Sequence, residues 1–141
     1  MASNKEIVGR LEGIQLFSRC SKSDLKIVAR HAETMTAESG RDIVREGDAG
    51  DALFVLLSGT ARVVRDGETV AELGPGDYFG ELALLDPAPR AATVTATSDV
   101  ELAVVGVRMF NVMLRELPPL GARLLGDLAA RVRAAGTPPT A

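Results

Sequence analysis

The sequence predicts an α+β fold that is mainly β: an antiparallel β-roll or jelly roll with N-terminal helices and two C-terminal helices. Three observations support this prediction. Between residues 31 and 105, short runs rich in β-branched residues recur at roughly the 8–12-residue spacing of an all-β sandwich or barrel. Glycine turns separate these runs. On either side of this segment, the apolar residues take a helical spacing, so helices are expected there.

The first thirty residues are expected to form the N-terminal helices. Ile7 and Leu11 begin a roughly helical apolar spacing. Ser21 is a candidate N-cap for a second helix, because its hydroxyl can accept from a free backbone N–H and Asp24 adds an acid to the first turn. The apolar residues that follow this cap are Leu25, Val28 and Ala29.

The β segment contains six expected strands, joined by recognisable turns. Asp66-Gly67 suits a type I′ hairpin turn, in which both central residues need a positive φ. Gly74–Asp77, "GPGD", is a second turn in which Pro75 fixes φ. The expected strands are the runs 41–46, 52–58, 60–66, 68–73, 91–97 and 100–106.

Two helices are expected after residue 105. Residues 107–117 present one apolar helical face that includes Phe110. Pro118-Pro119 interrupts this pattern, because proline disfavours helix at the residue before it. A last helix at 120–134 carries a stripe of leucines, and the tail 136–141 is expected to be disordered. Residues 1–135 are therefore predicted to form one domain.

Composition excludes several classes of function. The 141 residues carry a formal net charge of −3, which argues against nucleic-acid binding because phosphate backbones attract a basic face. No apolar run approaches the roughly 20 residues of a membrane span, so no membrane partner is expected. The start of the chain lacks the apolar region of a secretory signal. Cys20, the one cysteine, fits a reducing compartment such as the cytoplasm.

Metal and nucleophile chemistry have little support in the sequence. A zinc site usually needs three or four ligands from histidine, cysteine and carboxylates, and His31 is the one histidine. We therefore expect no metal site, no cofactor and no catalytic residue, and interpret His31 as a structural or surface residue.

The stretch 79–94, "FGELALLDPAPRAATV", carries the strongest functional signal. A short helical turn that begins at Gly80 would expose backbone N–H groups, which favour an anion. Arg90 adds a positive charge with a planar fork suited to phosphate. Glu81 cannot bind the anion itself but can accept from a sugar hydroxyl, so the set suggests a nucleotide. The residues alone leave an alternative open, in which Glu81 and Arg90 merely pair across a turn.

This stretch closely resembles the phosphate-binding cassette of cyclic-nucleotide-binding domains, the family of the catabolite activator protein and the regulatory subunits of protein kinase A. The resemblance extends to "EGDAGDALFVLLSGTARV" (46–63) and "LEGIQLFSRCSKSDL" (11–25), and it covers roughly Leu11 to Arg133. It implies a cyclic nucleotide-binding domain at 1–135, with a short cassette helix after Gly80.

The resemblance also implies roles for individual residues. Arg90 would neutralise the cyclic phosphate, with a backbone contact from Ala92. Glu81 would accept from the ribose 2′-hydroxyl, and Asp51 would orient Arg90 as a carboxylate locking the guanidinium. The residues expected to surround the phosphate and ribose are Gly80, Leu82 and Ala83, and those expected to face the base and sugar are Val63 and Val70.

The identity of the base depends on Ala91. Family members selective for cyclic GMP often carry a threonine at this position, whose hydroxyl can bond to guanine. Because Ala91 has no hydroxyl, cyclic AMP (cAMP) is the expected ligand. One hydrogen bond is worth only about 0.5–1.5 kcal/mol, so cyclic GMP (cGMP) is disfavoured rather than excluded.

The family's switch moves the last two helices against the cassette. By resemblance, Leu84 in the cassette would shift when phosphate binds, Phe110 would follow, and the final helix would swing over the base. Unlike many relatives, the chain offers no aromatic residue after Phe110 to cap the base. The leucines that would form the lid are Leu124, Leu125 and Leu128. The same stripe is equally compatible with core packing or a dimer seam, so a monomer and a homodimer through the last helix both remain open.

The leading hypothesis is a stand-alone, non-enzymatic cAMP-binding protein that signals to a protein effector in trans or sequesters cAMP. The sequence is expected to contain no output domain, although a fragment of a longer protein would look the same. The alternative is a protein-interaction module on the same fold that binds no nucleotide. Hydrolysis of a cyclic phosphate usually needs a metal ion or a positioned base, which makes catalysis the weakest hypothesis.

Overall fold

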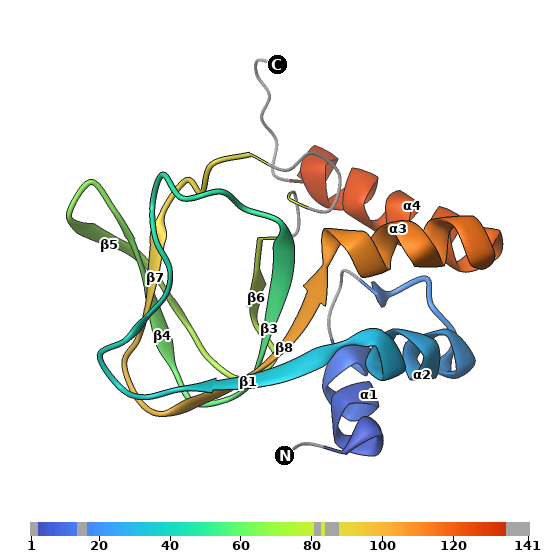
Figure 1. Ribbon diagram of the computed structural model, residues 1–141, viewed down its shortest axis with the longest axis horizontal. Helices are drawn as coiled ribbons and strands as arrows, with labels where there is room; N and C mark the ends of the chain where they lie inside the picture. The colour runs from blue at the N-terminus through green and yellow to red at the C-terminus, as the bar shows by residue number, and fades with distance from the viewer. Residues whose placement is uncertain (1–2, 14–16, 81–82, 84–87, 135–141) are drawn as a thin grey trace.

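The computed structural model describes residues 3–13, 17–80, 83 and 88–134 (Figure 1). Strands make up the middle of the chain and helices its two ends, which confirms the mainly β class with N-terminal helices and two C-terminal helices. In chain order the elements are α1 (Asn4–Glu12), α2 (Lys22–His31), β1 (Glu33–Ala37), β2 (Asp42–Val44), β3 (Ala52–Ser58), β4 (Ala61–Arg65), β5 (Glu68–Leu73), β6 (Tyr78–Phe79), β7 (Thr93–Ala96), β8 (Val100–Gly106), α3 (Val107–Glu116) and α4 (Pro118–Ala134).

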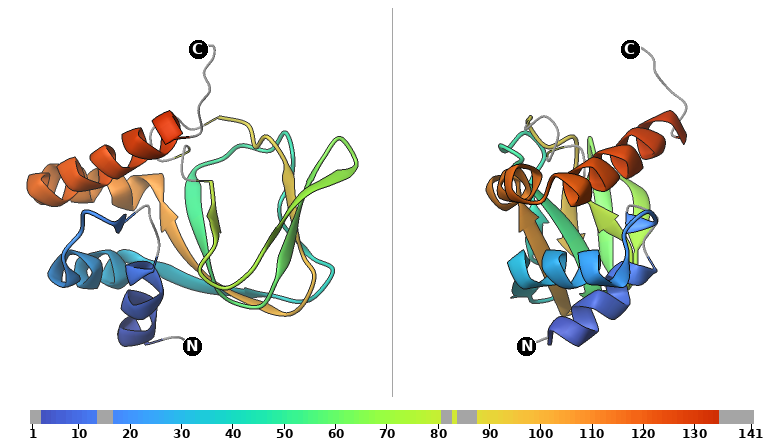
Figure 2. Two further views of the ribbon diagram at one scale, coloured as in Figure 1. Left: turned by 180° about the vertical axis from the view of Figure 1, so that it is seen from behind. Right: turned by 90° about the vertical axis from the view of Figure 1, so that its right-hand side faces the viewer.

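The strands form two antiparallel sheets that fold into a roll, with the helices gathered at one side of it (Figures 1 and 2). One sheet has the order β1-β8-β3-β6 and the other the order β2-β7-β4-β5. Strand β8 leads directly into α3, so the first sheet carries the C-terminal helices.

Strand β3 is the centre of the core, because both of its faces are buried. Phe54 and Leu56 belong to the apolar cluster shared by the strands, together with Val94 and Leu102. The alternate residues of β3 face the helices, since side chains of a strand point to opposite sides. This second cluster contains Leu53, Val55, Leu57, Phe110 and residues of α1 and α2. The continuous apolar run of β3 reflects this burial on both faces.

The structure contains two strands that the sequence patterns did not predict. Strand β1, "ETMTA", lies at a sheet edge beside β8, and its β-branched residues are the threonines Thr34 and Thr36 rather than valine or isoleucine. Strand β6 has two residues, too few to show a period, and pairs Phe79 with Phe54 of β3. Both strands are fixed by their partner strands rather than by local propensity.

The predicted turns and helix ends are present. Asp66 and Gly67 have φ values of 52° and 79°, as a type I′ turn requires. Ser21 caps α2 in a capping box with Asp24, whose carboxylate accepts from the Ser21 N–H at 2.9 Å. His31 ends this helix, with Nδ1 2.9 Å from the Ile27 carbonyl, which is the structural role expected of it.

The last helix begins earlier than the sequence pattern predicted. The apolar stripe suggested a start at residue 120, whereas α4 begins at Pro118. Proline is tolerated in the first turn of a helix, where its missing N–H has no intrahelical acceptor to lose. The two prolines therefore separate α3 from α4 and also start α4.

An ion pair joins α4 to α2. The Arg123 guanidinium donates to both carboxylate oxygens of Asp24, through Nε and Nη2, each at 2.7 Å. The Asp24 side chain is 9% exposed and that of Arg123 is 39% exposed. This hydrogen bond from Arg123 is the main reason that the pKa of Asp24 lies below its ordinary value of 3.8.

We predict that Asp24 stabilises the fold in a pH-dependent way. A carboxylate whose pKa is lowered on folding contributes stability above its unfolded pKa, and that contribution is lost as pH falls through the folded pKa. The free energy of unfolding of Asp24→Asn should therefore lie below that of the wild type at neutral pH, and the gap should close as the pH falls below about 4. Urea unfolding at a series of pH values measures this gap. The exposed Glu72→Gln is the control, and a gap for Asp24→Asn that does not change with pH would contradict the prediction.

Candidate functional site

The site is built around Arg90, which two loops hold in place. The Arg90 N–H donates to the Asp48 carbonyl at 2.7 Å, and the Gly47 N–H donates to the Arg90 carbonyl at 2.9 Å. The Gly50 N–H donates to the Ala88 carbonyl at 3.0 Å. The backbone of residues 88–90 is thus fastened to residues 47–50, and this fixes the point from which the Arg90 side chain leaves.

The Arg90 guanidinium is positioned by a main-chain oxygen and an aromatic ring. Its Nη2 donates to the Ala52 carbonyl at 3.1 Å, and its Cζ lies 5.5 Å from the centroid of the Phe54 ring. The Phe54 ring stacks on Phe79, with centroids 5.0 Å apart and an interplanar angle of 8°. A cation held over an aromatic face gains electrostatic stabilisation without a counter-charge.

Two glycines enclose the Arg90 side chain. A Cβ on Gly50 would lie 2.9 Å from Arg90 Nε and from the Ala88 carbonyl oxygen. A Cβ on Gly80 would lie 2.5 Å from Arg90 Nη1 and 2.6 Å from the Ala52 carbonyl oxygen. Gly80 also has a φ of 84°, which side-chain-bearing residues rarely adopt. Only glycine at both positions lets the backbone approach the guanidinium this closely.

The electrostatic setting of Arg90 favours an anion. Partial burial lowers the pKa of Arg90 from its ordinary value, while the charge of Asp51 acts in the opposite direction. An arginine keeps its proton under these conditions, so the cost of desolvating the cation is partly uncompensated. No described carboxylate forms an ion pair with Arg90, so an anionic ligand would supply a counter-charge.

The predicted lock between Asp51 and Arg90 is not a direct contact. Both residues are described, and neither a hydrogen bond nor an ion pair joins their side chains. The Asp51 carboxylate is exposed to solvent, and the Ala52 carbonyl orients the guanidinium instead. The Asp51 main chain has a separate role, since its carbonyl accepts from the Val107 N–H at the start of α3 at 2.8 Å.

A cavity of about 480 Å³ opens beside Arg90 and gathers all the described residues that were predicted to contact cAMP except Val70. Its apolar walls come from β2, β4, β5 and β7 through Val44, Val63, Leu73 and Val94. The predicted residues that line it are Val63, Gly80, Ala83, Arg90, Ala91 and Ala92.

Arg65 is a second cation of the cavity that the sequence patterns did not identify. It lies two residues after Val63 in β4 and therefore on the same face of the strand. Its Nε donates to the Ala91 carbonyl at 3.3 Å. Extending the strand alternation from Val63 by one step would have found it.

The prediction that Val70 faces inward is wrong. Val70 is 52% exposed and does not line the cavity. The β4–β5 pairing shifts register, so that Val63 lies opposite Ala71 and Val64 opposite Thr69. Leu73 of the same strand lines the cavity, and Val70 lies three residues before it, so strand alternation places the Val70 side chain on the opposite face. Val70 is also the extra residue at the register shift.

Some of the predicted site residues lie outside the described part of the chain, and for others only the main chain is described. Glu81, Leu82, Leu84 and the cassette helix to which they were assigned lie outside the described residues, as does the tail 136–141. Leu124 and Leu128 belong to α4, but the description does not extend to their side chains. Leu125 is 39% exposed, whereas Phe110 is 2% exposed within the cluster under the helices.

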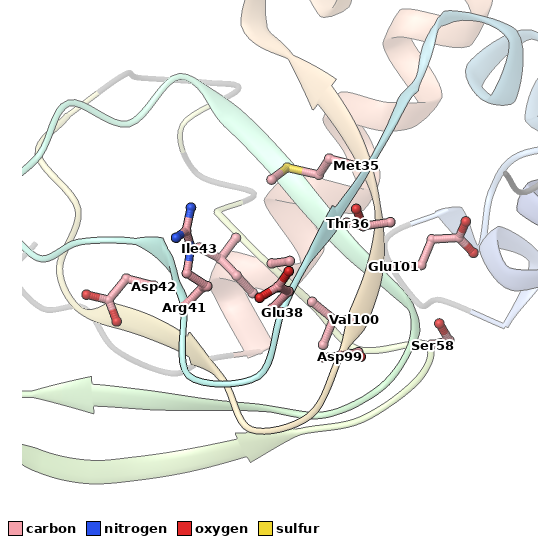
Figure 3. Close-up of a pocket in the computed structure, with 11 residues that line it drawn as sticks. Met35, Thr36, Glu38, Arg41, Asp42, Ile43, Ser58, Asp99, Val100 and Glu101 are labelled. Atoms are coloured by element: carbon pink, nitrogen blue, oxygen red, sulfur yellow. The ribbon is translucent and has the colours of Figure 1, made fainter.

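A larger cavity, of about 680 Å³, is chemically unsuited to a phosphate (Figure 3). It lies at β1, the turn into β2 and the start of β8, and Arg90 is not among its lining residues. Arg41 is the one cation among its lining residues, beside the carboxylates of Glu38, Asp42, Asp99 and Glu101. This acidic lining repels anions, so the smaller cavity at Arg90 is the candidate site.

Two other kinds of site find no support in the described part of the chain. It contains no group of three or more histidine, cysteine, aspartate or glutamate residues placed to hold a metal ion. None of its helices combines the length and the apolar character that crossing a bilayer requires.

Comparison with known proteins identifies the family to which this chain is similar. The cyclic nucleotide-binding domain family matches residues 34–116. A cAMP-dependent protein kinase regulatory subunit of Hypocrea atroviridis is 39% identical over 104 residues, which are 74% of this chain and 22% of that protein. The cyclic AMP receptor protein of Thermus thermophilus is 32% identical over 130 residues, which are 89% of this chain and 60% of that protein.

A solved structure shows the same fold over nearly its whole length. The N-terminal domain of a transcriptional regulator from Streptomyces coelicolor A3(2) superposes with a TM-score of 0.84 and 31% identity, covering 90% of this chain and 94% of that one. The chain belongs to the cyclic nucleotide-binding domain family. It spans less than two thirds of the length of the kinase subunit and of the receptor protein.

We predict that Gly50→Ala disturbs the site, because the new methyl group would push on both Arg90 and residue 88. Overpacking of this kind costs about 1–3 kcal/mol in unfolding free energy, and the displaced guanidinium should bind an anion less well. Gly74→Ala is the matched control, since a Cβ there meets nothing within 4 Å and its φ is not positive. Denaturant unfolding compares the two variants, and equal stabilities would show that Gly50 is not a close contact of Arg90.

Proposed function

We propose that this domain binds a cyclic nucleotide, with cAMP preferred, in the cavity beside Arg90. The observation that carries the proposal is the enclosure of Arg90 between Gly50 and Gly80, which holds a partly desolvated cation at the wall of an apolar cavity. A cyclic nucleotide combines the groups that such a site can satisfy: one anionic phosphate and a flat, largely apolar base.

Each part of the ligand has a candidate partner in the cavity. Arg90 would pair with the phosphate, and the backbone at Gly80, Ala83 and Ala92 would lie beside it. Glu81 would accept from the ribose 2′-hydroxyl, as the family resemblance implies. Val63 and the other apolar walls would cover the base and sugar. The positive charge of Arg65 would add to the attraction for the anion.

The preference for cAMP rests on Ala91 and on the relatives. Ala91 lines the cavity and offers no hydroxyl to a guanine amino group. Two of the relatives are named for cAMP, as a regulatory subunit of a cAMP-dependent kinase and as a cyclic AMP receptor protein. cGMP would bind more weakly, by about the value of one hydrogen bond.

The output of binding would be a change in the position of α4. Phe110 of α3 packs in one apolar cluster with Leu53 and Val55 of β3. The same strand carries Phe54, whose ring lies under Arg90. Closure of the leucines of α4 over the ligand would break or strain the Asp24–Arg123 pair, so the ligand-free and bound states would differ at this contact. The domain would then act on a protein effector in trans, or hold cAMP, in the reducing cytoplasm where Cys20 remains a thiol.

Calorimetric titration of the refolded, nucleotide-free protein with cAMP and cGMP tests the proposal. We expect saturable cAMP binding with a Kd near or below about 10 μM, equivalent to about −7 kcal/mol, and weaker binding of cGMP. Arg90→Ala should abolish binding, because the phosphate then enters the cavity without its counter-charge. Arg108→Ala, at an exposed arginine of α3, is the control and should bind as the wild type does.

A titration without binding would support the alternative function. If a folded protein gives no heat with either nucleotide, the cavity is a remnant of the family's fold, and the domain is a protein-interaction module that does not depend on nucleotide. Binding that survives Arg90→Ala would contradict the assigned role of Arg90.

A further inference from the structure

A groove between α1 and α2 lies on the helical side of the molecule, apart from the cavity at Arg90. Its volume is about 640 Å³. The right-hand view of Figure 2 shows the two helices side by side at the front of the molecule. We call this feature the α1–α2 groove; its lining residues are Asn4, Lys5, Val8, Gly9, Glu12, Lys22, Lys26 and Arg30.

The α1–α2 groove is basic, although the whole chain carries a net charge of −3. Lys22, Lys26 and Arg30 follow one another at intervals of four residues and therefore form a stripe along one face of α2. Lys5 of α1 adds a fourth cation, and Glu12 is the one acid of the lining. The four cations are exposed, and no ion pair is found for any of them among the described residues.

The shape of the groove suits a side chain from another molecule. Gly9 lies on α1 without a side chain, and a Cβ built there would meet nothing within 4 Å. Val8, which is 5% exposed, gives an apolar residue at the base of the groove. Lysine and arginine cover such surfaces with their aliphatic stems while their charges stay in water. The groove therefore offers an apolar notch with cations along its rim.

We propose that the α1–α2 groove binds an acidic amphipathic helix of a partner protein. The stripe repeats every four residues, so carboxylates at the same interval along a facing helix can pair with successive cations. The notch at Gly9 takes an apolar side chain from the same helix. A concave groove fits a helix better than it fits the flat surface of a bilayer. The four cations lie along one groove and do not form the broad basic face that would bind the phosphate backbone of a nucleic acid.

The position of α2 connects this surface to the rest of the molecule. Asp24 lies in α2 between Lys22 and Lys26, and it holds Arg123 of α4 through two bonds of 2.7 Å. A partner on α2 would therefore contact the helix that is fastened to α4. Any coupling between partner and nucleotide rests on the proposed function, whereas binding of the acidic helix does not.

Fluorescence anisotropy with a defined probe tests the groove. The probe is a labelled helical peptide of about 18 residues with glutamate at every fourth position and leucine on the adjacent face. The test variant is Lys22→Glu/Lys26→Glu/Arg30→Glu. The matched control is Arg41→Glu/Arg62→Glu/Arg108→Glu, which makes the same change in net charge at exposed positions outside the groove. Gly9→Gln tests the notch without altering any charge, and circular dichroism establishes that each variant is folded.

We expect the peptide to bind the wild type, with an affinity that falls at least about fivefold between about 50 and 300 mM salt. The affinity of the groove variant for the peptide should be lower than that of the wild type by about tenfold or more, whereas the affinity of the control should stay within about twofold. Gly9→Gln should weaken binding without changing its salt dependence. Equal losses in the groove variant and the control would overturn the proposal, because only net charge would then matter. Absence of binding to the folded wild type would also overturn it.

Two further titrations separate the groove from other sources of binding. Equal or tighter binding to duplex DNA or to phosphatidylserine vesicles would overturn the proposal, since the stripe would then be a general anion patch. A protein that binds the peptide but not cAMP would leave the groove intact while contradicting the proposed function.

Discussion

The structure of the site depends on one constraint, the confinement of the Arg90 guanidinium between two glycine backbones and above the Phe54 ring. The main chain fixes both ends of this arrangement, through residues 47–50 at the base of the side chain and the Ala52 carbonyl at its tip. A cation held in this way has lost part of its hydration, and no carboxylate of the described residues forms an ion pair with it. Such an arrangement contributes little to stability on its own, and under the proposed function the phosphate of the ligand would complete it.

Strand β3 connects the cavity to the helices. Phe54 lies under Arg90, while its neighbours Leu53 and Val55 contact the cluster that contains Phe110. The Asp51 carbonyl, immediately before this strand, also receives the first N–H of α3. A small displacement at Arg90 can therefore reach α3 through packed side chains and one backbone hydrogen bond. At the far end of the helices, the Asp24–Arg123 pair provides a contact whose making and breaking would distinguish two positions of α4.

Much of this organisation follows from the sequence, because it depends on local patterns. The capping box at Ser21, the Asp66-Gly67 turn and the long strands each have a residue pattern with a direct physical cause. The edge strand β1 and the two-residue β6 were missed because they depend on pairing with strands distant in sequence. Arg65 at the cavity and the outward side of Val70 follow from strand alternation with Val63 and Leu73. The main-chain oxygen that orients Arg90 could not have been predicted from side-chain identities, because every residue has a carbonyl group. The role predicted for Asp51 rests on the family resemblance, and no hydrogen bond or ion pair joins its side chain to that of Arg90 in the structure.

The most direct test of this site is the NMR signal of the Arg90 Nε–H group, assigned by its loss in Arg90→Lys and followed as cAMP or adenosine is added. If Arg90 is a pre-positioned receptor for an anion, its Nε–H should give a sharp signal, distinct from those of exposed arginines, before any ligand is present. That signal should shift with cAMP and not with adenosine, which lacks the phosphate. A signal that coincides with those of exposed arginines, or one that stays unchanged at saturating cAMP, would contradict the central role given to Arg90.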